Sequence, residues 1–392
     1  MKKLLVVGAG EFQLPGIMKA KELGYYVIAT DGDQNAPGKN IADEFMVIDV
    51  KDIYRHLEIA QNYKIEGIVS FAAEVAVETV AYVSQQLKLV GNGYDVAVLS
   101  HDKKMYYYKL EQAGVRVPKT VLPSEFLRCE NEWPKVVVKP SKGSGSRLVA
   151  KLQPNQVQTY IEENVKLLGT EEEFLIQEHI DGKEMTVDCF VYQDNIYILA
   201  VSEEKTKAEN SVSYELVFPP VWLDEEVNET VSRVTKKIIN SLGITYGPVH
   251  MEYMLKEDKT LYLIDFSLRG GGFKVFTDIV KLTSGEDIVE KYVRSAMGEQ
   301  IQLSQPNHYA PVILRFLYSD RKGIIKSLPS KYEGVFLSHM FFYLKKPGEC
   351  IDVPKTGKDR IAYMICWGDE LSCLQAQADH IAGQGKVVLE SC

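Results

Sequence analysis

No run of about 18 consecutive apolar residues occurs in the sequence, so it predicts no membrane-spanning helix and no membrane partner. The first residues, MKKLLVVGAG, begin like a secretory signal, but their apolar run covers only residues 4–7 before glycines and Glu11 interrupt it. A signal peptide needs about 7–15 apolar residues at this place. We therefore interpret the segment as a first β-strand.

Cysteine pairs and basic runs are also missing. The six cysteines form no CxxC pair and no Cys/His spacing typical of a zinc site, which favours free thiols in a reducing cytoplasm. The chain has 45 basic and 54 acidic residues, a net charge of −9, and its basic residues form no run. This pattern argues against nucleic acid as a partner, although lysines within one pocket can still bind a phosphorylated ligand.

The 392 residues are enough for two or three domains. Strand-like and helix-like segments alternate through residues 1–100, which predicts a parallel sheet covered on both faces. Residues 101–304 predict a mixture of strands, hairpins and helices, and residues 305–392 are strand-rich with one helix near the end. We therefore expect an α/β domain followed by α+β structure.

A glycine turn follows the first predicted strand. Gly8 and Gly10 form a GxG, and Asp31 follows later in the sequence. In a dinucleotide-binding fingerprint an acidic residue follows the glycines by about 20 residues, and Asp31 matches this spacing. The third glycine of that fingerprint is missing, because Gln13 stands in its place. A tight strand–helix turn is the favoured interpretation, and a nicotinamide-dependent oxidoreductase stays as an alternative.

The segment VVVKPSKGSGSRLV, residues 136–149, has its lysine before its glycines, the reverse of the Walker A order. Lys139 ends a Val-rich strand, where its ammonium can contact a phosphate as a point charge. The small residues that follow let backbone N–H groups approach phosphate oxygens and add hydroxyl donors. They are Gly143, Ser144, Gly145 and Ser146. A plain hairpin between two strands is the alternative.

Two carboxylates flank the turn in QEHIDGKEM. Gln177 and Glu178 end one predicted strand, and Glu184 opens the next. If these side chains face one cleft, they could accept hydrogen bonds from an adenine amino group and from ribose hydroxyls. A solvated hairpin explains the same residues.

A second pair of carboxylates lies in HMEYMLKEDKTLYLIDFSLR, where two predicted strands bring Glu252 near Asp265. Close carboxylates repel each other unless a cation lies between them, and Mg²⁺ prefers such oxygen ligands. The period of two puts Ser267 and Arg269 on the same face as Asp265. A surface hairpin with alternating polar residues is the alternative.

These segments, in this order, resemble the ATP-grasp superfamily, in its carboxylate–amine ligase branch with carbamoyl-phosphate-synthetase-like and biotin-carboxylase-like members. The opening GAGEFQLPGIMKAKELGYYVIATDGD and the segment HDKKMYYYKLEQAGVRVPKT are similar to that family as well. The resemblance implies a Rossmann-like domain over residues 1–100 and an ATP-grasp domain over 101–304, with a mobile lid at about 120–190. A carboxy-terminal α+β domain over 305–392 would complete the fold.

The resemblance also implies roles in nucleotide binding. Lys103 and Lys139 match lysines that contact ATP phosphates, and residues 143–146 match the glycine-rich cover of the lid. Glu178 matches the hinge position, and Glu184 matches the glutamate on the nucleotide side.

Further matches concern the metal and the reacting group. Glu252 matches the first metal ligand, and Arg269 matches the arginine that neutralises the reacting group. The family has Glu-x-Asn-x-Arg where this sequence has Asp265, Ser267 and Arg269. One expected metal ligand is therefore shorter, and a hydroxyl replaces an amide.

The function implied is an ADP-forming carboxylate–amine ligase that works through an acyl phosphate on an amino acid or another small carboxylate. ATP and Mg²⁺, with Mn²⁺ as a substitute, are the expected cofactors, and Lys139 and Arg269 the expected catalytic residues. A small carboxylate and an amine are the expected partners, and a homodimer is one expected assembly. A bicarbonate-activating carboxylase is an alternative, although no biotin-attachment motif such as AMKM occurs. A non-catalytic ATP-binding protein is another.

The acceptor pocket is less clear from the sequence. Residues 205–220 are interpreted as one wall of it, or as an exposed connection. Glu74 suits either a helix start or a substrate contact, and His250 is interpreted as structural. The aromatic run in residues 105–109 is interpreted as packing and surface.

Overall fold

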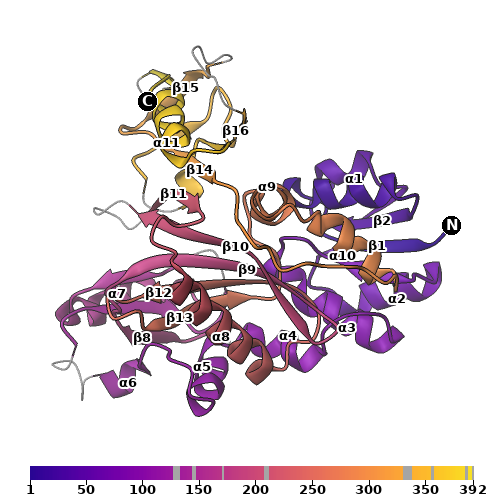
Figure 1. Ribbon diagram of the computed structural model, residues 1–392, viewed down its shortest axis with the longest axis horizontal. Helices are drawn as coiled ribbons and strands as arrows, with labels where there is room; N and C mark the ends of the chain where they lie inside the picture. Colours follow the sequence, from indigo (N-terminus) through magenta and orange to yellow (C-terminus); the bar gives the residue numbers. More distant parts are fainter. Residues whose placement is uncertain are drawn as a thin grey trace.

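The computed structural model describes residues 1–126, 133–143, 147–169, 172–206, 212–329, 338–354, 357–384 and 387–390. These residues form four β-sheets with helices around them, and Figure 1 shows a carboxy-terminal lobe standing above the rest. One sheet is parallel and the other three are antiparallel, so the predicted combination of α/β and α+β structure is confirmed.

The amino-terminal sheet is parallel and has the order β3-β2-β1-β4. Its strands are β1 (Lys3–Val7), β2 (Tyr26–Asp31), β3 (Glu44–Val47) and β4 (Gly67–Val69). The helices of this region are α1 (Leu14–Glu22), α2 (Ile53–Tyr63), α3 (Val77–Leu87) and α4 (Tyr94–Ser100). Side chains on both faces of β1 are fully buried, as expected for a parallel sheet between helical layers.

The second sheet is small and has the order β5-β8-β6-β7. It consists of β5 (Thr120–Val121), β6 (Val136–Pro140), β7 (Ala150–Leu152) and β8 (Phe174–Glu178), with α6 (Pro123–Phe126) and α7 (Val157–Asn164) nearby. Val136 and Val138 pack against Phe174 and Ile176 on one face. Lys139 pairs with Leu175, so its side chain belongs to the other face.

The third sheet is the framework of the molecule, with eight strands in the order β13-β12-β9-β10-β11-β14-β18-β16. They are β9 (Lys183–Tyr192), β10 (Asn195–Thr206), β11 (Ser213–Phe218), β12 (Gly247–Leu255), β13 (Leu261–Ser267), β14 (Val312–Leu317), β16 (Ser338–Tyr343) and β18 (Ala362–Trp367). The apolar side of α8 (Glu225–Leu242) packs on it, together with residues of α5 (Lys103–Gln112).

The interpretation of residues 205–220 as a loop wall needs a correction. Residues 213–218 form β11, which pairs with both β10 and β14 and so joins the middle of the chain to its carboxy-terminal strands. The buried residues Leu216, Val217 and Phe218 explain why this segment is a central strand. Residues 207–211 lie outside the described part of the chain.

The carboxy-terminal lobe adds a sheet with the order β17-β15-β19. Its strands are β15 (Gly323–Ser327), β17 (Cys350–Ile351) and β19 (Val388–Glu390). Helix α11 (Leu371–Gln384) packs through Leu374, Ala378 and Ile381 on β14 and β18. The short strands β15 and β17 were not predicted.

Several short helices complete the described structure. They are η1 (Glu11–Gln13), η2 (Pro37–Asn40), η3 (Glu74–Ala76), η4 (Pro154–Gln156), η5 (Val165–Leu167), η7 (Gly357–Asp359), the π-helical turn η6 (Val275–Ile279), α9 (Val280–Ser284) and α10 (Ile288–Ala296). Across the described ranges, the search for a helix with the length and apolarity needed to traverse a bilayer finds none.

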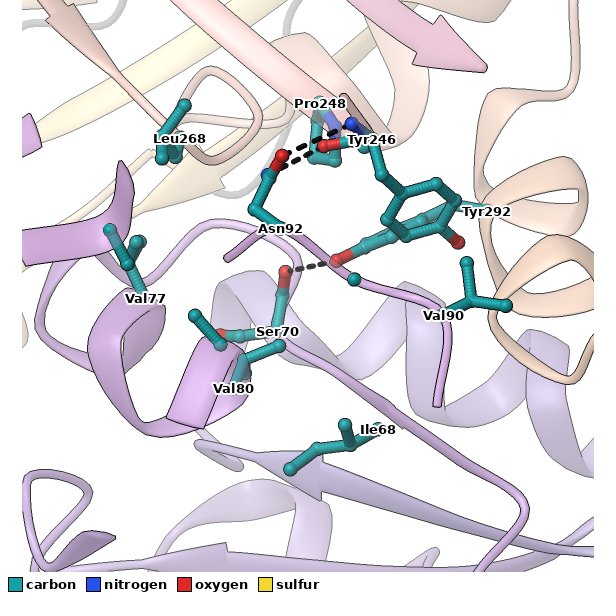
Figure 2. A pocket seen from close by; sticks show the side chains of 14 residues that line it. Ile68, Ser70, Val77, Val80, Val90, Asn92, Tyr246, Pro248, Leu268 and Tyr292 are labelled. Atoms are coloured by element: carbon teal, nitrogen blue, oxygen red, sulfur yellow. Dashed lines mark hydrogen bonds between the residues drawn. The ribbon is translucent and has the colours of Figure 1, made fainter. Parts of the chain in front are cut away.

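The parallel sheet region meets the eight-stranded sheet at a tightly packed boundary, shown in Figure 2. Asn92 donates to the Tyr246 carbonyl at 2.7 Å and accepts from the Tyr246 N–H at 3.1 Å. The cavity beside them measures about 30 Å³, which has room for about one water molecule. It is too small for a nucleotide, so the boundary serves to position the two regions.

We expect Gly16→Ala to destabilise the fold. A Cβ at this position would lie 2.0 Å from the Phe71 ring, which is fully buried at the end of β4. Overpacking of this kind typically costs about 1–3 kcal/mol in the free energy of unfolding. Urea denaturation measures the effect, with Gly32→Ala as the control, because nothing lies within 4 Å of a Cβ there. If both variants were equally stable, the packing assigned to Gly16 would be wrong.

Candidate active site

The predicted carboxylates meet on one face of the eight-stranded sheet. In the β12–β13 register, Glu252 lies opposite Asp265 and His250 lies opposite Ser267. In the β9–β12 register, Glu252 also lies opposite Thr186. Residues directly opposite each other in an antiparallel pair point to the same face, so these side chains share one surface.

Asp265 is held by two donors from α5. The Lys103 ammonium lies 2.7 and 3.0 Å from its two carboxylate oxygens, and the Tyr106 hydroxyl donates to it at 2.8 Å. The Asp102 side chain caps α5 by accepting the Met105 N–H, which fixes Lys103 as the first residue of the helix. Burial alone would raise the pKa of Asp265, but the charges of Lys103 and Lys139 bring it below its usual value.

Lys139 reaches the same strand from the small sheet. Its ammonium, on a side chain that is 4% exposed, donates to the Tyr107 hydroxyl at 2.7 Å and to the Ile264 carbonyl at 3.1 Å. Burial lowers the pKa of Lys139, and the charges of Asp265 and Glu252 oppose that shift. The two lysines and both carboxylates therefore form one electrostatic unit.

A β-bulge provides the acceptor for Lys139. The β12–β13 register shifts after Glu252, so that Tyr253 pairs with Leu263 and Ile264 has no partner on β12. A bulged residue leaves the regular hydrogen-bond ladder. The Ile264 carbonyl instead accepts from the Lys139 ammonium and the Tyr107 hydroxyl.

Tyr106 and Tyr107 were interpreted from the sequence only as packing. Both are buried, and both hydroxyls contact the residues around Asp265. The available signal was the run of three tyrosines, residues 106–108, that begins three residues after the predicted phosphate lysine Lys103, since a buried tyrosine hydroxyl usually needs a partner.

The donor set of Glu252 and Asp265 fits Mg²⁺. Burial and the charge of Asp265 raise the pKa of Glu252, so a cation between them would relieve their repulsion. In the described residues no three carboxylate, imidazole or thiol groups form a ready-made metal cage. Mg²⁺ commonly binds one or two carboxylates and completes its shell with phosphate oxygens and water, so two carboxylates are a suitable set.

Arg269 is tied to the amino-terminal region through Glu74. The Arg269 Nε lies 3.2 Å from one Glu74 oxygen, the His101 Nε2 lies 3.1 Å from the other, and His101 Nδ1 lies 2.7 Å from Glu78. Burial would raise the pKa of Glu74, but His101 and Arg269 bring it below its usual value. Glu74 therefore links the expected catalytic arginine to the segment that precedes Lys103.

His250 belongs to a second network on the same face. Its Nδ1 lies 3.1 Å from both oxygens of Asp188, and Asp188 also accepts the Gly271 N–H at 3.0 Å. A Cβ on Gly271 would lie 2.8 Å from the Asp188 carboxylate, so the chain after Arg269 can approach Asp188 only as glycine. This network fixes the turn that follows Arg269.

The other predicted nucleotide residues are more spread out. Gln177 lies opposite Val137, on the Lys139 face of the small sheet, and donates to the Thr120 hydroxyl at 2.7 Å. The Glu178 carboxylate accepts the Lys119 N–H at 2.9 Å from the opposite face. Glu184 shares the sheet face with Glu252, and burial raises its pKa.

The predicted lid loop is described only in part. Gly143 has φ +103°, a conformation that favours glycine. Residues 144–146, Ser144, Gly145 and Ser146, lie outside the described part of the chain. Their role stays a prediction.

The glycine turn after β1 is stabilised by hydrogen bonds to Asp31, the last residue of β2. The Asp31 carboxylate accepts the Ala9 N–H at 2.8 Å and the Asp33 N–H at 2.9 Å. The Asp31 side chain is therefore engaged in stabilising the backbone of the strand–helix turn. These hydrogen bonds favour the structural interpretation of the GxG.

Comparisons with known proteins agree with this geometry. Residues 133–277 match the family model of the ATP-grasp domain. Over 356 residues the chain is 25% identical to the carbamoyl phosphate synthase large chain of Pseudothermotoga lettingae, covering 84% of this chain and 31% of that protein. This chain therefore spans about a third of the length of that relative.

Two crystal structures share the fold over nearly the whole chain. An L-amino acid ligase from Bacillus licheniformis has a TM-score of 0.85 at 16% identity, covering 100% of this chain and 99% of that chain. The biotin carboxylase domain of 2-oxoglutarate carboxylase from Hydrogenobacter thermophilus, in complex with MgADP and bicarbonate, has a TM-score of 0.78 at 20% identity, covering 99% and 91%. At such identities the likeness establishes the fold.

We expect His101→Gln to flatten the pH dependence of stability. Burial would lower the pKa of His101, but Glu74 and Glu78 raise it from 6.5 to about 9. The stabilisation is therefore complete below pH 6.5 and is lost as the pH rises through about 9. Between these pH values the free energy of unfolding should fall by at most about 1.4 kcal/mol per pH unit through this one group.

Urea denaturation between these pH values measures the difference between wild type and variant. The exposed His308 supplies the control, His308→Gln, which should keep the wild-type slope. Equal slopes for wild type and His101→Gln would show that His101 carries no such charge.

Proposed function

The chain carries an ATP-grasp domain, and on that premise we propose that it is an ATP-dependent, ADP-forming carboxylate–amine ligase. The single observation that supports this most strongly is the meeting of Lys103 and Lys139 with Asp265 beside Glu252. Two cations and two carboxylates on converging elements match the needs of a magnesium triphosphate, which presents the opposite charges.

The proposed ATP site lies between the small sheet and the eight-stranded sheet. Lys103 and Lys139 would neutralise the phosphates, and the small residues of the lid loop would donate N–H groups to them. The full set proposed for nucleotide binding is Lys103, Lys139, Gly143, Ser144, Gly145, Ser146, Gln177, Glu178 and Glu184. Glu252 and Asp265 would hold Mg²⁺ or Mn²⁺, with Ser267 beside them, and the metal would supply further neutralisation of the phosphates.

The protein groups must exchange partners when the nucleotide binds. Lys103 is paired with Asp265, and Arg269 is paired with Glu74; both carboxylates are partly buried. If Asp265 held a metal, Lys103 would pair with the phosphates in its place, so no charge would be left without a partner. This exchange explains how a strongly charged site stays stable before its ligand arrives.

The proposed reaction has two steps. A carboxylate oxygen of the first substrate attacks the γ-phosphorus, and ADP leaves with the electrons of the broken P–O bond. The amine of the second substrate then attacks the acyl carbon, phosphate leaves, and the amine loses a proton. Arg269 is proposed to stabilise the charge that develops on the acyl group, since preorganised cations act most strongly in a site that excludes water.

A bicarbonate-activating carboxylase is the second candidate, because the likeness to the biotin carboxylase domain covers nearly the whole chain. It predicts phosphate release with bicarbonate alone. A non-catalytic nucleotide-binding protein predicts tight ATP binding and no ADP with any acid and amine. The proposed domains are residues 1–100, 101–304 and 305–392, and a homodimer stays part of the proposal.

We expect Lys139→Ala and Arg269→Ala to lower the rate of ADP formation by about 10²–10³-fold, because each removes a preorganised charge. A coupled ADP assay over pairs of amino acids and small carboxylates measures this and identifies the substrates. Lys135→Ala is the matched control, since Lys135 precedes the same strand and is exposed. Wild-type ADP formation by either site variant would contradict the assignment.

We further expect ATP with Mg²⁺, but not NAD or NADP, to raise the melting temperature. A ligand present at 100 times its Kd stabilises the folded state by about 2.7 kcal/mol. Thermal unfolding with each nucleotide measures the shift. Stabilisation by NAD or NADP alone would favour the oxidoreductase instead.

A further inference from the structure

A second charged site lies next to the active site, where the carboxy-terminal strands meet the turn after Arg269. Its cation is Arg360, whose guanidinium carbon lies 3.8 Å from the centre of the Phe316 ring and 4.5 Å from that of Phe273. The Arg360 Nε donates to the Tyr318 hydroxyl at 3.0 Å. Within the described ranges, no carboxylate lies in ion-pair distance of this guanidinium.

The groups that hold Arg360, namely the rings of Phe273 and Phe316 and the Tyr318 hydroxyl, come from distant parts of the chain. Phe273 follows the glycines after Arg269 and has φ +49°, a strained conformation for a phenylalanine. Its ring centre lies 5.3 Å from that of Phe12, in the turn after β1, and 5.0 Å from that of Phe316 on β14. Such strain is typical of functional sites, and here it carries the ring that holds Arg360.

The anion of this site is Glu204 on β10. Ser202, two residues before it, lies opposite Thr186, and Thr186 lies opposite Glu252, so Glu204 shares the sheet face of the proposed metal ligand. Its charge also raises the pKa of Glu252. Burial and the charge of Glu184 raise the pKa of Glu204 to about 7, and Arg360 is among the groups that oppose this shift.

The contacts of Arg360 lead to the same end of β10. The Tyr318 hydroxyl, which accepts from Arg360 Nε at 3.0 Å, donates to the Ser213 carbonyl at 2.7 Å, and Ser213 lies opposite Thr206, two residues after Glu204.

The two charges are nevertheless held apart. An ion pair requires a nitrogen–oxygen distance of 4.0 Å or less, and Glu204 forms none with Arg360 or with any other cation of the described residues. Arg360 is restrained by two rings and a hydroxyl, and Glu204 by the central strand β10. Opposite charges that are fixed near each other without contact suit a ligand that carries both signs.

We propose that Glu204 and Arg360 bind an amino acid as a zwitterion, with Glu204 accepting hydrogen bonds from its ammonium group and Arg360 donating to its carboxylate. This inference rests on the proposed ligase function for the role of the amino acid, which is the amine-bearing second substrate. Glu204 lies on the sheet face of Glu252, whereas Arg360 belongs to the carboxy-terminal lobe, so the amino group would lie toward the phosphoryl site and the carboxylate away from it.

A carboxylate suits Arg360 better than a phosphate does. A guanidinium matches a carboxylate with two parallel hydrogen bonds, whereas a dianionic phosphate needs more positive charge. The other cation of this turn, Lys274, already lies 3.4 Å from Asp278 and 4.8 Å from the centre of the Phe342 ring. One available guanidinium therefore favours a singly charged anion.

Ligand-observed NMR with a mixture of the 20 proteinogenic amino acids, in the presence of ADP and Mg²⁺, tests the proposal without turnover. Calorimetry on the best binder then compares it with its carboxamide and with its analogue that lacks the amino group. We expect Arg360→Gln to bind the acid and the carboxamide equally, and Glu204→Gln to lose the preference for the amino group. Each variant should bind the amino acid roughly 10- to 100-fold more weakly, the effect of losing a charge-assisted pair.

Two neighbours supply matched controls. Glu203→Gln changes the adjacent glutamate, which pairs with Val217 and points to the opposite sheet face, and Arg321→Gln removes an exposed arginine. Both should keep wild-type binding of the amino acid, and these two variants and Arg360→Gln should bind ADP with Mg²⁺ normally.

No amino acid binding by the wild type, or an unchanged preference for the carboxylate in Arg360→Gln, would overturn the proposal. So would Arg360-dependent binding of ribose 5-phosphate in place of amino acids. The ligase function is tested separately by ADP formation, which other acids and amines could still support if this site bound no amino acid.

Discussion

The repulsion between two carboxylates on neighbouring strands, Glu252 and Asp265, is the constraint that determines how the small sheet and α5 pack on the large sheet. The β12–β13 register gives Glu252 and Asp265 no freedom to separate, and both are only partly exposed to water, Asp265 through 27% of its side chain. The cations that make this arrangement tolerable come from outside the sheet, Lys103 from α5 and Lys139 from β6. The electrostatics of one hairpin therefore help to hold the small sheet and α5 against the large sheet.

The main chain takes part in this arrangement. The bulge at Ile264 removes one carbonyl from the β12–β13 ladder and gives it to Lys139 and Tyr107. A regular ladder would have used that carbonyl within the sheet, and the Lys139 ammonium, on a residue that is only 4% exposed, would have lost an acceptor. Beyond the hairpin, Glu74 connects Arg269 to His101, two residues before Lys103. The groups proposed for phosphates, metal and acyl group thus share partners and respond to one another.

The sequence predicted those parts of the site that follow from a local period. Alternation along two adjacent strands was enough to bring Glu252 opposite Asp265 and to set Lys139 at the end of a buried strand. Contacts that depend on register or on tertiary approach could not be found this way. The bulge at Ile264 leaves no local signature, and strand β11 was hidden because its polar flanks suggested a loop. Arg360 was missed because its partners Phe273 and Phe316 are far away in the sequence.

The departure from the family pattern at Asp265 has a physical counterpart in α5. Aspartate is one methylene shorter than glutamate, so its carboxylate stays close to β13, where its oxygen also accepts the Phe266 N–H at 2.9 Å. The Tyr106 hydroxyl and the Lys103 ammonium extend from α5 to meet it there. A longer side chain would carry the carboxylate further out from the sheet and away from these donors. Asp265 and Tyr106 therefore form one unit, in which side chains from α5 extend to a carboxylate that stays close to β13.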